Sequence, residues 1–338
     1  MGIPARARLG VDRSPDFTAV NRILSNAWDI LVAEVNSEII GFLDMRHMKL
    51  RIGAQVAPAT YVGLAGIQER WRGTAAFLRL TRESEKLCRS LGSKLVITLV
   101  NIRNSRLSRF LELRHGACTH TERIVVSCIL LGPHYRWNKR IDYGYATEKD
   151  LPEISQLISK SYDNYLIASQ LEENRFANFP NFKLKNILLA RDTAGQIVAV
   201  LGLWNQGEFR RTRILGYRFL DYCLRAFVSG LSNFIRFAPV PRPGENLNIL
   251  NAIYAVAKEG HEEEFAGLLR HACNISANQG YHFLLLAAAE NDPLSKACHG
   301  LWRMTNVNIP VIIPLDDKIE ALIQKEAAKR VHIEYALI

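Results

Sequence analysis

One unit, residues 61–100, constrains the fold of this chain more than any other stretch. Residues 61–67 form an apolar run bounded by polar residues, which predicts a buried strand. A polar loop, residues 68–75, leads into a helical pattern that stops at Gly92, a typical C-terminal cap. Residues 95–100 are apolar on both sides, as in a central parallel strand. The order predicts a βαβ crossover whose basic loop lies at a helix N-terminus, where backbone N–H groups favour anions.

At these residues the sequence resembles the GNAT superfamily of N-acetyltransferases. The acetyl-CoA loop of that family reads Arg/Gln-x-x-Gly-x-Gly/Ala, and residues 70–75, Arg-Trp-Arg-Gly-Thr-Ala, fit it. A second register, starting at Arg72, fits the helix length better but places Ala75 and Phe77 where glycines are expected. In that register Phe77 would obstruct a pyrophosphate, whereas its periodicity favours a core residue of the helix.

The resemblance implies both a fold and a set of site residues. The fold class is α/β (α+β), with two tandem GNAT-like domains, each a mixed, mostly antiparallel sheet with flanking helices. In the family, the central strand lies beside the acyl-pantetheine, the loop holds the phosphates, and an Asn after the next strand helps to hold the cofactor. The cofactor-binding residues implied here are Leu64, Ala65, Gly66, Ile67, Arg70, Arg72, Gly73, Thr74, Ala75 and Asn104.

Proton transfer needs further residues, and the sequence offers two candidate bases. Tyr61 belongs to the predicted central strand and Glu34 to a predicted hairpin, and a structural role is the alternative for either. The resemblance implies a tyrosine that protonates the leaving thiolate, but Leu111 stands at its position. Cys298 and His299 are adjacent on a predicted helix and so do not face each other, which favours a core cysteine and a surface histidine.

A second, weaker copy of the unit follows. Residues 247–257 repeat the central strand and residues 281–289 its partner, while Gly92 and Gly280 keep an offset of 188 residues. The loop between these strands has become Lys-Glu-Gly-His-Glu-Glu-Glu, residues 258–264. Its carboxylates suit the helix dipole but would repel a pyrophosphate. We therefore expect no coenzyme A binding through this second loop.

The two copies predict two domains. Residues 1–140 form an N-terminal GNAT-like domain that holds the acyl-CoA site and is short of the usual first strand and helix, either naturally trimmed or lost from this version of the sequence. Residues 141–338 form a degenerate C-terminal domain with a helical insertion, residues 205–246. The insertion predicts a basic amphipathic helix over residues 214–237. Such a helix can lie on a membrane surface or bind a partner, and the alternative is a helix buried between the two domains. Residues 331–338 predict a closing strand that covers the open sheet edge.

Positive charge is concentrated in the first of these domains. The chain of 338 residues has a formal net charge of +10. Residues 1–140 carry 22 Lys and Arg against 11 Asp and Glu, whereas residues 141–338 carry 21 against 22. A positive potential concentrates anionic ligands, which include coenzyme A, RNA and acidic protein surfaces.

The cysteine spacing and the length of the apolar runs argue against a zinc-binding protein and a membrane-spanning protein. The six cysteines form no CxxC pair and no zinc-like spacing, so we expect reduced core cysteines and no metal site. No apolar run approaches the ~20 residues of a membrane span, and no signal pattern opens the chain, which predicts a cytoplasmic protein without a membrane span.

The leading hypothesis for function is an N-acyltransferase that uses an acyl-CoA, acetyl-CoA above all, to acylate an amine on a small molecule or a peptide. The alternative is a non-catalytic GNAT-derived module that senses acyl-CoA or binds RNA or an acidic protein. The absence of the family's tyrosine in both copies, where Leu111 and Cys298 stand instead, favours this alternative. The sequence leaves the acceptor and the oligomeric state open.

Overall fold

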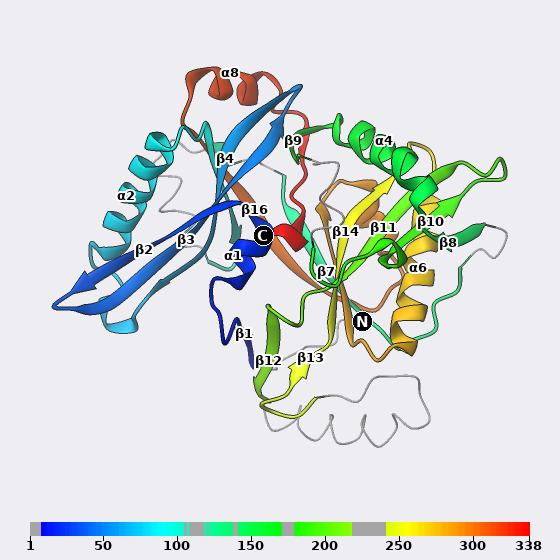
Figure 1. The fold of residues 1–338 in the computed structure, drawn as a ribbon, viewed down its shortest axis with the longest axis horizontal. Helices are drawn as coiled ribbons and strands as arrows, with labels where there is room; N and C mark the ends of the chain where they lie inside the picture. The colour runs from blue at the N-terminus through cyan, green and yellow to red at the C-terminus, as the bar shows by residue number, and fades with distance from the viewer. Residues whose placement is uncertain are drawn as a thin grey trace.

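The computed structural model of this protein describes residues 8–104, 107, 118–119, 122–137, 141–170, 179–217 and 241–338. We call residues 1–140 the first half and residues 141–338 the second half. Figure 1 shows the two halves side by side, with the last residues of the chain between them.

The elements of the first half are β1 (Arg8–Asp12), α1 (Ala19–Leu24), β2 (Ala27–Val35), β3 (Glu38–Ile52), β4 (Gln55–Ile67), η1 (Glu69–Trp71), α2 (Ala76–Ser90), β5 (Leu95–Asn101), β6 (Cys118–Thr119) and β7 (Ile124–Leu130). Those of the second half are β8 (Asp142–Tyr145), η2 (Glu148–Asp150), α4 (Leu151–Tyr162), β9 (Tyr165–Ser169), η4 (Leu184–Asn186), β10 (Ile187–Arg191), β11 (Ile197–Asn205), β12 (Arg211–Gly216), β13 (Asn246–Leu247), β14 (Ile249–Ala257), α6 (Glu262–Asn278), β15 (Phe283–Ala289), α7 (Pro293–Ala297), β16 (Arg303–Pro314), α8 (Asp317–Lys325), β17 (Arg330–Val331) and η5 (Tyr335–Leu337).

Fourteen strands of the described ranges form one sheet that runs through both halves. Its order is β17-β9-β3-β4-β5-β16-β7-β15-β14-β11-β10-β8, with β2 paired to β3 and β6 to β16. The neighbours are antiparallel except for β4–β5, β14–β15 and β17–β9, which are parallel. This agrees with the predicted mixed, mostly antiparallel sheet. A second sheet of three strands has the order β1-β12-β13.

The halves exchange one strand each at the centre of the large sheet. β16 belongs to the second half, yet it pairs with β5 of the first half. β7 belongs to the first half, yet it pairs with β15 of the second half, and β7 and β16 pair with each other. Figure 1 shows β16 and β7 crossing the middle of the molecule. The backbone ladder is therefore continuous across both halves, and the division of the chain at residue 140 stays a prediction about its organisation.

The first half begins its sheet with the predicted hairpin. β2 and β3 meet at Asn36 and Ser37, which both have positive φ values of 50° and 63°, as a two-residue type I′ turn requires. β3 then turns at Gly53 into β4. Helix α2 covers one face of these strands, where its Cys88 packs among the core that holds Met45.

The predicted helix of the insertion is wrong at its start. Ile214 and Gly216 lie in β12, which pairs with β1 and β13. Arginine and smaller residues alternate from Arg211 to Ile214, and this period of two suits a strand whose backbone pairs on both sides. Residues 218–237 lie outside the described residues.

The predicted closing strand over residues 331–338 is wrong beyond Val331. β17 ends there, and it pairs with β9 rather than with the edge of the first half. β9 itself pairs with the end of β3 at Leu50, so an edge of β3 is covered by a strand of the second half. None of the helices in the described ranges combines the length and apolar content that a membrane crossing needs.

Candidate active site

The parallel strands β4 and β5 separate within the first half. Their ladder ends at the pair Tyr61 and Ile97, although β4 continues to Ile67 and β5 to Asn101. Beyond the last pair, the Thr98 hydroxyl donates to the Val62 carbonyl at 2.7 Å. The two carboxyl ends therefore enclose a V-shaped opening in the sheet, which we call the first V.

A β-bulge lies on β4 at the apex of the first V. Leu43 of β3 pairs with Ala65, but Met45 pairs with Val62, so β4 carries one extra residue. A bulge leaves its extra residue out of the ladder and redirects its backbone groups. Leu64, beside the extra residue, is 37% exposed, so the bulge is accessible. The predicted residues Leu64, Ala65, Gly66 and Ile67 all lie on the β4 arm of the V.

The loop at the open end of the first V has the geometry of an anion site. Gly73 has φ +85°, and a Cβ built on it would meet no atom within 4 Å. Helix α2 begins at Ala76 with Ala75 as its N-cap. Among the described residues, the Gly73 and Ala75 backbone N–H groups have no hydrogen-bond partner. The Thr74 hydroxyl accepts from the Ala76 N–H at 3.3 Å. An open glycine before a helix N-terminus is a backbone arrangement that can accept an anion.

Of the two aromatic side chains that could block this loop, Phe77 packs elsewhere. Phe77 is partly buried against the core between α2 and the sheet, where Met45 and Cys88 also lie. It is therefore a core residue of the helix, as its periodicity predicts. Trp71 is half-buried, and its indole Nε1 is buried and has no hydrogen-bond partner among the residues that the structure describes.

The predicted polar residues lie around the mouth of the first V. Arg70 forms an exposed ion pair with Glu38, and the Arg72 Nε donates to the Ile67 carbonyl at 3.3 Å. That bond fixes Arg72 at the end of β4, and no carboxylate of the described residues pairs with its guanidinium. Asn104 follows β5, and its Oδ1 accepts from the Leu107 N–H at 3.3 Å, as a helix N-cap does.

Tyr61, the first candidate base, lies at the apex of the first V and is 6% exposed. The Arg46 guanidinium lies over its ring at 5.0 Å from the centroid. Burial raises the pKa of Tyr61 to about 12, although Arg46 opposes the shift. A phenol with this pKa stays protonated at neutral pH, so it is suited to donate a proton and not to remove one.

Glu34, the second candidate, lies elsewhere. It is exposed near the end of β2, opposite Ile39. Trp28 is the β2 residue opposite Arg46, and Arg46 lies opposite Tyr61. Six residues of strand, about 20 Å, therefore separate Glu34 from the level of Tyr61. The structure does not bring the two candidates together, and Leu111 lies outside the described residues.

A buried polar cluster beside the bulge was missed in the sequence. The Asp44 carboxylate, 0% exposed, accepts from Arg13 at 3.2 Å and from the Asn21 Nδ2 at 2.6 Å. Its Oδ2 lies 3.5 Å from a Cβ built on Gly63 at the bulge. Asp44 and Arg46 share one face of β3, and two charges spaced by two in an apolar strand were the available signal.

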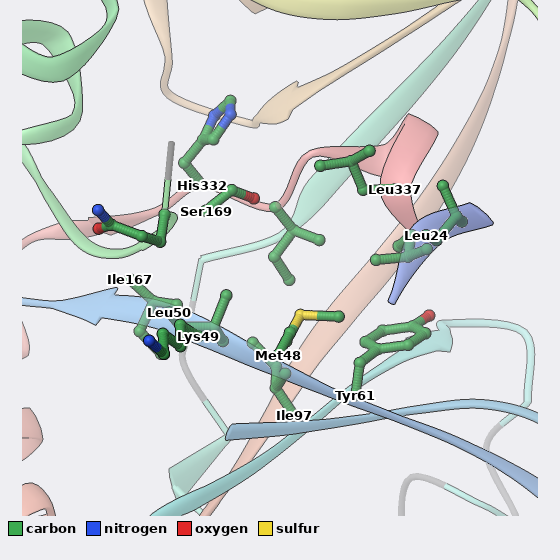
Figure 2. Close-up of a pocket in the computed structure, with 13 residues that line it drawn as sticks. Leu24, Met48, Lys49, Leu50, Tyr61, Ile97, Ile167, Ser169, His332 and Leu337 are labelled. Carbon is green, nitrogen blue, oxygen red and sulfur yellow. The ribbon is translucent and has the colours of Figure 1, made fainter. Parts of the chain in front are cut away.

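A small cavity lies on the same face, just beyond the apex of the first V. Its volume is about 30 Å³. Figure 2 shows Met48, Ile97 and Tyr61 on one side of it, and His332 and Leu337 on the other. The full lining is Leu24, Met48, Lys49, Leu50, Tyr61, Ile97, Ile167, Ser169, Gln170, His332, Ile333, Leu337 and Ile338. Residues from both halves thus meet at the apex.

The second half repeats the loop with the opposite charge. Gly260 has φ +83° and open space around its Cβ position, like Gly73. Helix α6 then starts with Glu262 and two further glutamates in its first turn, and the Glu262 Oε1 accepts from the Gly260 N–H at 3.2 Å. The chain's own carboxylates thus occupy this helix N-terminus, and they would repel a phosphate.

Cys298 and His299 do not form a nucleophilic pair. Cys298 is 1% exposed, and burial raises the pKa of its thiol, whereas His299 is exposed. Among the described residues, no three His, Cys, Asp or Glu side chains are placed to hold a metal ion.

Comparisons with known proteins define the class of fold. No protein-family model matches the chain, and no curated protein matches its sequence. The structure resembles Saccharomyces cerevisiae N-myristoyltransferase with bound myristoyl-CoA, at a TM-score of 0.59 and 8% identity over 90% of this chain and 75% of that one. It also resembles a GCN5-related N-acetyltransferase from Sphaerobacter thermophilus, at 0.56 and 12% over 85% and 82%. These likenesses confirm the predicted GNAT-type fold.

Proposed function

We propose that this protein is an acyl-CoA-dependent N-acyltransferase whose site is the first V. One observation carries the proposal: an open V with a bulge at its apex leads to an uncrowded glycine loop at a helix N-terminus. The residues present fit a coenzyme A ester. The unpaired Gly73 and Ala75 N–H groups, Arg70 and Arg72 would hold the pyrophosphate. The β4 backbone over Leu64–Ile67 would lie along the pantetheine, and Asn104 would be an outer contact.

The donor would supply an acyl group activated as a thioester. Backbone at the β4 bulge, near Gly63 and Leu64, would stabilise negative charge that develops on the acyl carbonyl. Tyr61, protonated at neutral pH, would donate a hydrogen bond or a proton at the apex.

The size of the apical cavity supports acetyl-CoA as the donor. A volume of about 30 Å³ accommodates about two or three groups the size of a water molecule. This is enough for the methyl of an acetyl group and too little for a long alkyl chain. The neighbour with bound myristoyl-CoA therefore shares the fold but is not expected to share its acyl group with this chain.

The second candidate function is a non-catalytic module that senses acyl-CoA or binds RNA or an acidic protein. Exposed arginines without a carboxylate partner in the described part, such as Arg72 and Arg79, favour it. It differs from the enzyme in one measurable respect, because a sensor binds the donor without releasing a thiol.

Thermal unfolding with and without acetyl-CoA tests the proposal. Ligand at 100 times its Kd stabilises the native state by about 2.7 kcal/mol, which shifts the melting temperature measurably. Arg72→Glu should abolish the shift, whereas Arg242→Glu, an exposed arginine of the second half, should retain it. Release of free thiol with a panel of amines would then identify an enzyme. A wild-type melting temperature that acetyl-CoA leaves unchanged would refute the site.

A further inference from the structure

The second half contains a V of its own. β14 and β15 pair in parallel only as far as Asn251 and Leu285, and both strands then continue. β14 carries an extra residue against β11 near Tyr254, whose φ is +55°. A positive φ is uncommon for a residue other than glycine, and it marks a backbone held in place by its surroundings. We call this opening the second V.

The two openings differ in what lies at the bulge. In the first V, Leu64 is 37% exposed, whereas Ala255, the matching residue of β14, is 4% exposed. A carboxylate from the last segment of the chain covers the second bulge: the Tyr254 backbone N–H donates to the Glu334 Oε2 at 2.9 Å. Glu334 is 5% exposed. It thus covers the backbone amide of Tyr254, the residue of β14 that matches Gly63 at the bulge of the first V.

Further side chains connect Glu334 to the surroundings of the second V. The Tyr162 hydroxyl donates to the Glu334 Oε2 at 3.3 Å. The Tyr165 hydroxyl donates to Asp292, which follows β15, at 2.5 Å. The His332 ring lies tilted against two tyrosine rings, with its centroid 4.8 Å from that of Tyr162 and 5.1 Å from that of Tyr165. A network of hydrogen bonds and ring contacts therefore runs from β14 to the residues that follow β15.

Three side chains hold the residues after Glu334 by their backbone carbonyls. Gln206 donates to the Ala336 carbonyl at 2.7 Å, Arg46 of the first half donates to Leu337 at 2.9 Å, and Arg210 donates to Ile338. Leu337 and Ile338 also line the apical cavity. Figure 2 shows Leu337 across this cavity from Tyr61 and Met48. The segment therefore connects the second V to the apex of the first.

We propose that the second V binds residues 332–338 of its own chain as a fixed ligand, and that this segment sets the size of the cavity at the apex of the first V. Glu334 anchors the segment on the bulge amide of Tyr254. Ile333, Leu337 and Ile338 then form one wall of the cavity. The degenerate half thus acts as a positioning element for the half that carries the proposed site.

Hydrogen exchange of the protein without any donor tests the anchor. Glu334→Ala should speed exchange of the Tyr254 amide and of the amides of residues 335–338 at least tenfold, with the amides of α2 unchanged. Glu334→Gln, which keeps an acceptor oxygen, should stay within threefold of wild type. Glu208→Ala, an exposed glutamate on the loop after β11, is the matched control and should change nothing. An unchanged Tyr254 amide in Glu334→Ala, equal acceleration in the Gln variant, or uniform acceleration that includes α2 would each overturn the proposal.

A second measurement tests the cavity wall and rests on the proposed function. Thermal shifts with acetyl-CoA and butanoyl-CoA give the relative affinity for the two donors. In Glu334→Ala, the affinity for butanoyl-CoA relative to acetyl-CoA should rise at least fivefold over wild type, and Glu208→Ala should leave the ratio unchanged. An unchanged ratio in Glu334→Ala would overturn the role in cavity size. If neither donor shifts the wild type, the proposed function fails, whereas the exchange experiment still decides whether the second V holds the segment.

Discussion

Gly73 and Gly260 share one left-handed backbone conformation, with φ +85° and +83°, in two loops of opposite charge. Each precedes a helix, and each has open space where a Cβ would point. The first loop is followed by Arg79 and lacks an acidic first turn, whereas the second carries three glutamates there. The two loops thus share the same turn but differ in charge. The helix after Gly73 has no carboxylate in its first turn that would repel a phosphate, whereas the helix after Gly260 has three.

Alanine variants of these two glycines test whether the loop at Gly73 binds the donor. Gly73→Ala and Gly260→Ala should each lower the free energy of unfolding by about 1 kcal/mol, because an L-residue is strained at positive φ although its Cβ has room. Denaturation in urea measures this cost. Only Gly73→Ala should also weaken the thermal shift with acetyl-CoA. Equal weakening in both variants would show that the loss arises from stability and not from the loop.

The buried carboxylate of Asp44 should matter for folding far more than any surface ion pair. Asp44→Asn removes the charge that compensates Arg13, whose side chain is 5% exposed, and we expect a loss of about 3 kcal/mol. Asp16→Asn breaks the exposed pair with Arg22 and should leave the unfolding midpoint nearly unchanged. Urea denaturation of the two variants beside wild type checks this. Similar midpoints for both would contradict the assignment of Asp44 to a desolvated cluster.

The buried phenol of Tyr61 predicts that the folded protein loses stability at alkaline pH. Its pKa is raised from 10.0 in the unfolded chain to about 12 in the fold, with burial as the main cause. The protonated phenol therefore favours the native state below pH 10, and this contribution is lost as the pH rises from about 10 towards 12. Between pH 8 and pH 11, wild type should lose about 1 kcal/mol more than Tyr61→Phe. Equilibrium unfolding at several pH values measures the difference, and parallel curves would place Tyr61 in a solvated environment.

The exchanged strands predict that the halves depend on each other. Residues 1–140 alone would lack β16 beside β5, and residues 141–338 alone would lack β7 beside β15. Each fragment would expose unpaired strand edges, which favour aggregation. We expect each fragment alone to be unfolded or aggregated, and the two expressed together to form a soluble complex. Circular dichroism and gel filtration check this, and a folded, monomeric first fragment would argue for two independent domains.

Local patterns in the sequence predicted much of this structure. The unit from β4 to β5 was predicted because its strands and helix are contiguous and each has a clear period. The turn at Asn36 was also predicted from its local sequence. The repeat was recognised from the constant offset between Gly92 and Gly280, and in the structure these two glycines have φ values of +75° and +80°. The loop of residues 70–75 was found by its short motif, although its open geometry became clear only in the structure.

What the sequence did not predict depends on contacts between distant residues. The exchange of β7 and β16 could not be predicted from local patterns, because each of these strands pairs with a strand of the other half of the chain. Arg46 is bonded to the carbonyl of Leu337, 291 positions away, so its burial has no local signal. Glu334 looked like one residue of a closing strand, yet its carboxylate binds a backbone amide instead.

The strand exchange has a consequence for how the protein is made. β5 ends at Asn101, while its neighbour β16 begins only at Arg303. At ~5–20 residues per second, a ribosome needs roughly 10–40 s to add the intervening polypeptide. Throughout that interval the nascent chain carries a central strand with one bare flank. Cells that synthesise this protein would therefore benefit from a chaperone that shields the growing polypeptide until β16 has emerged.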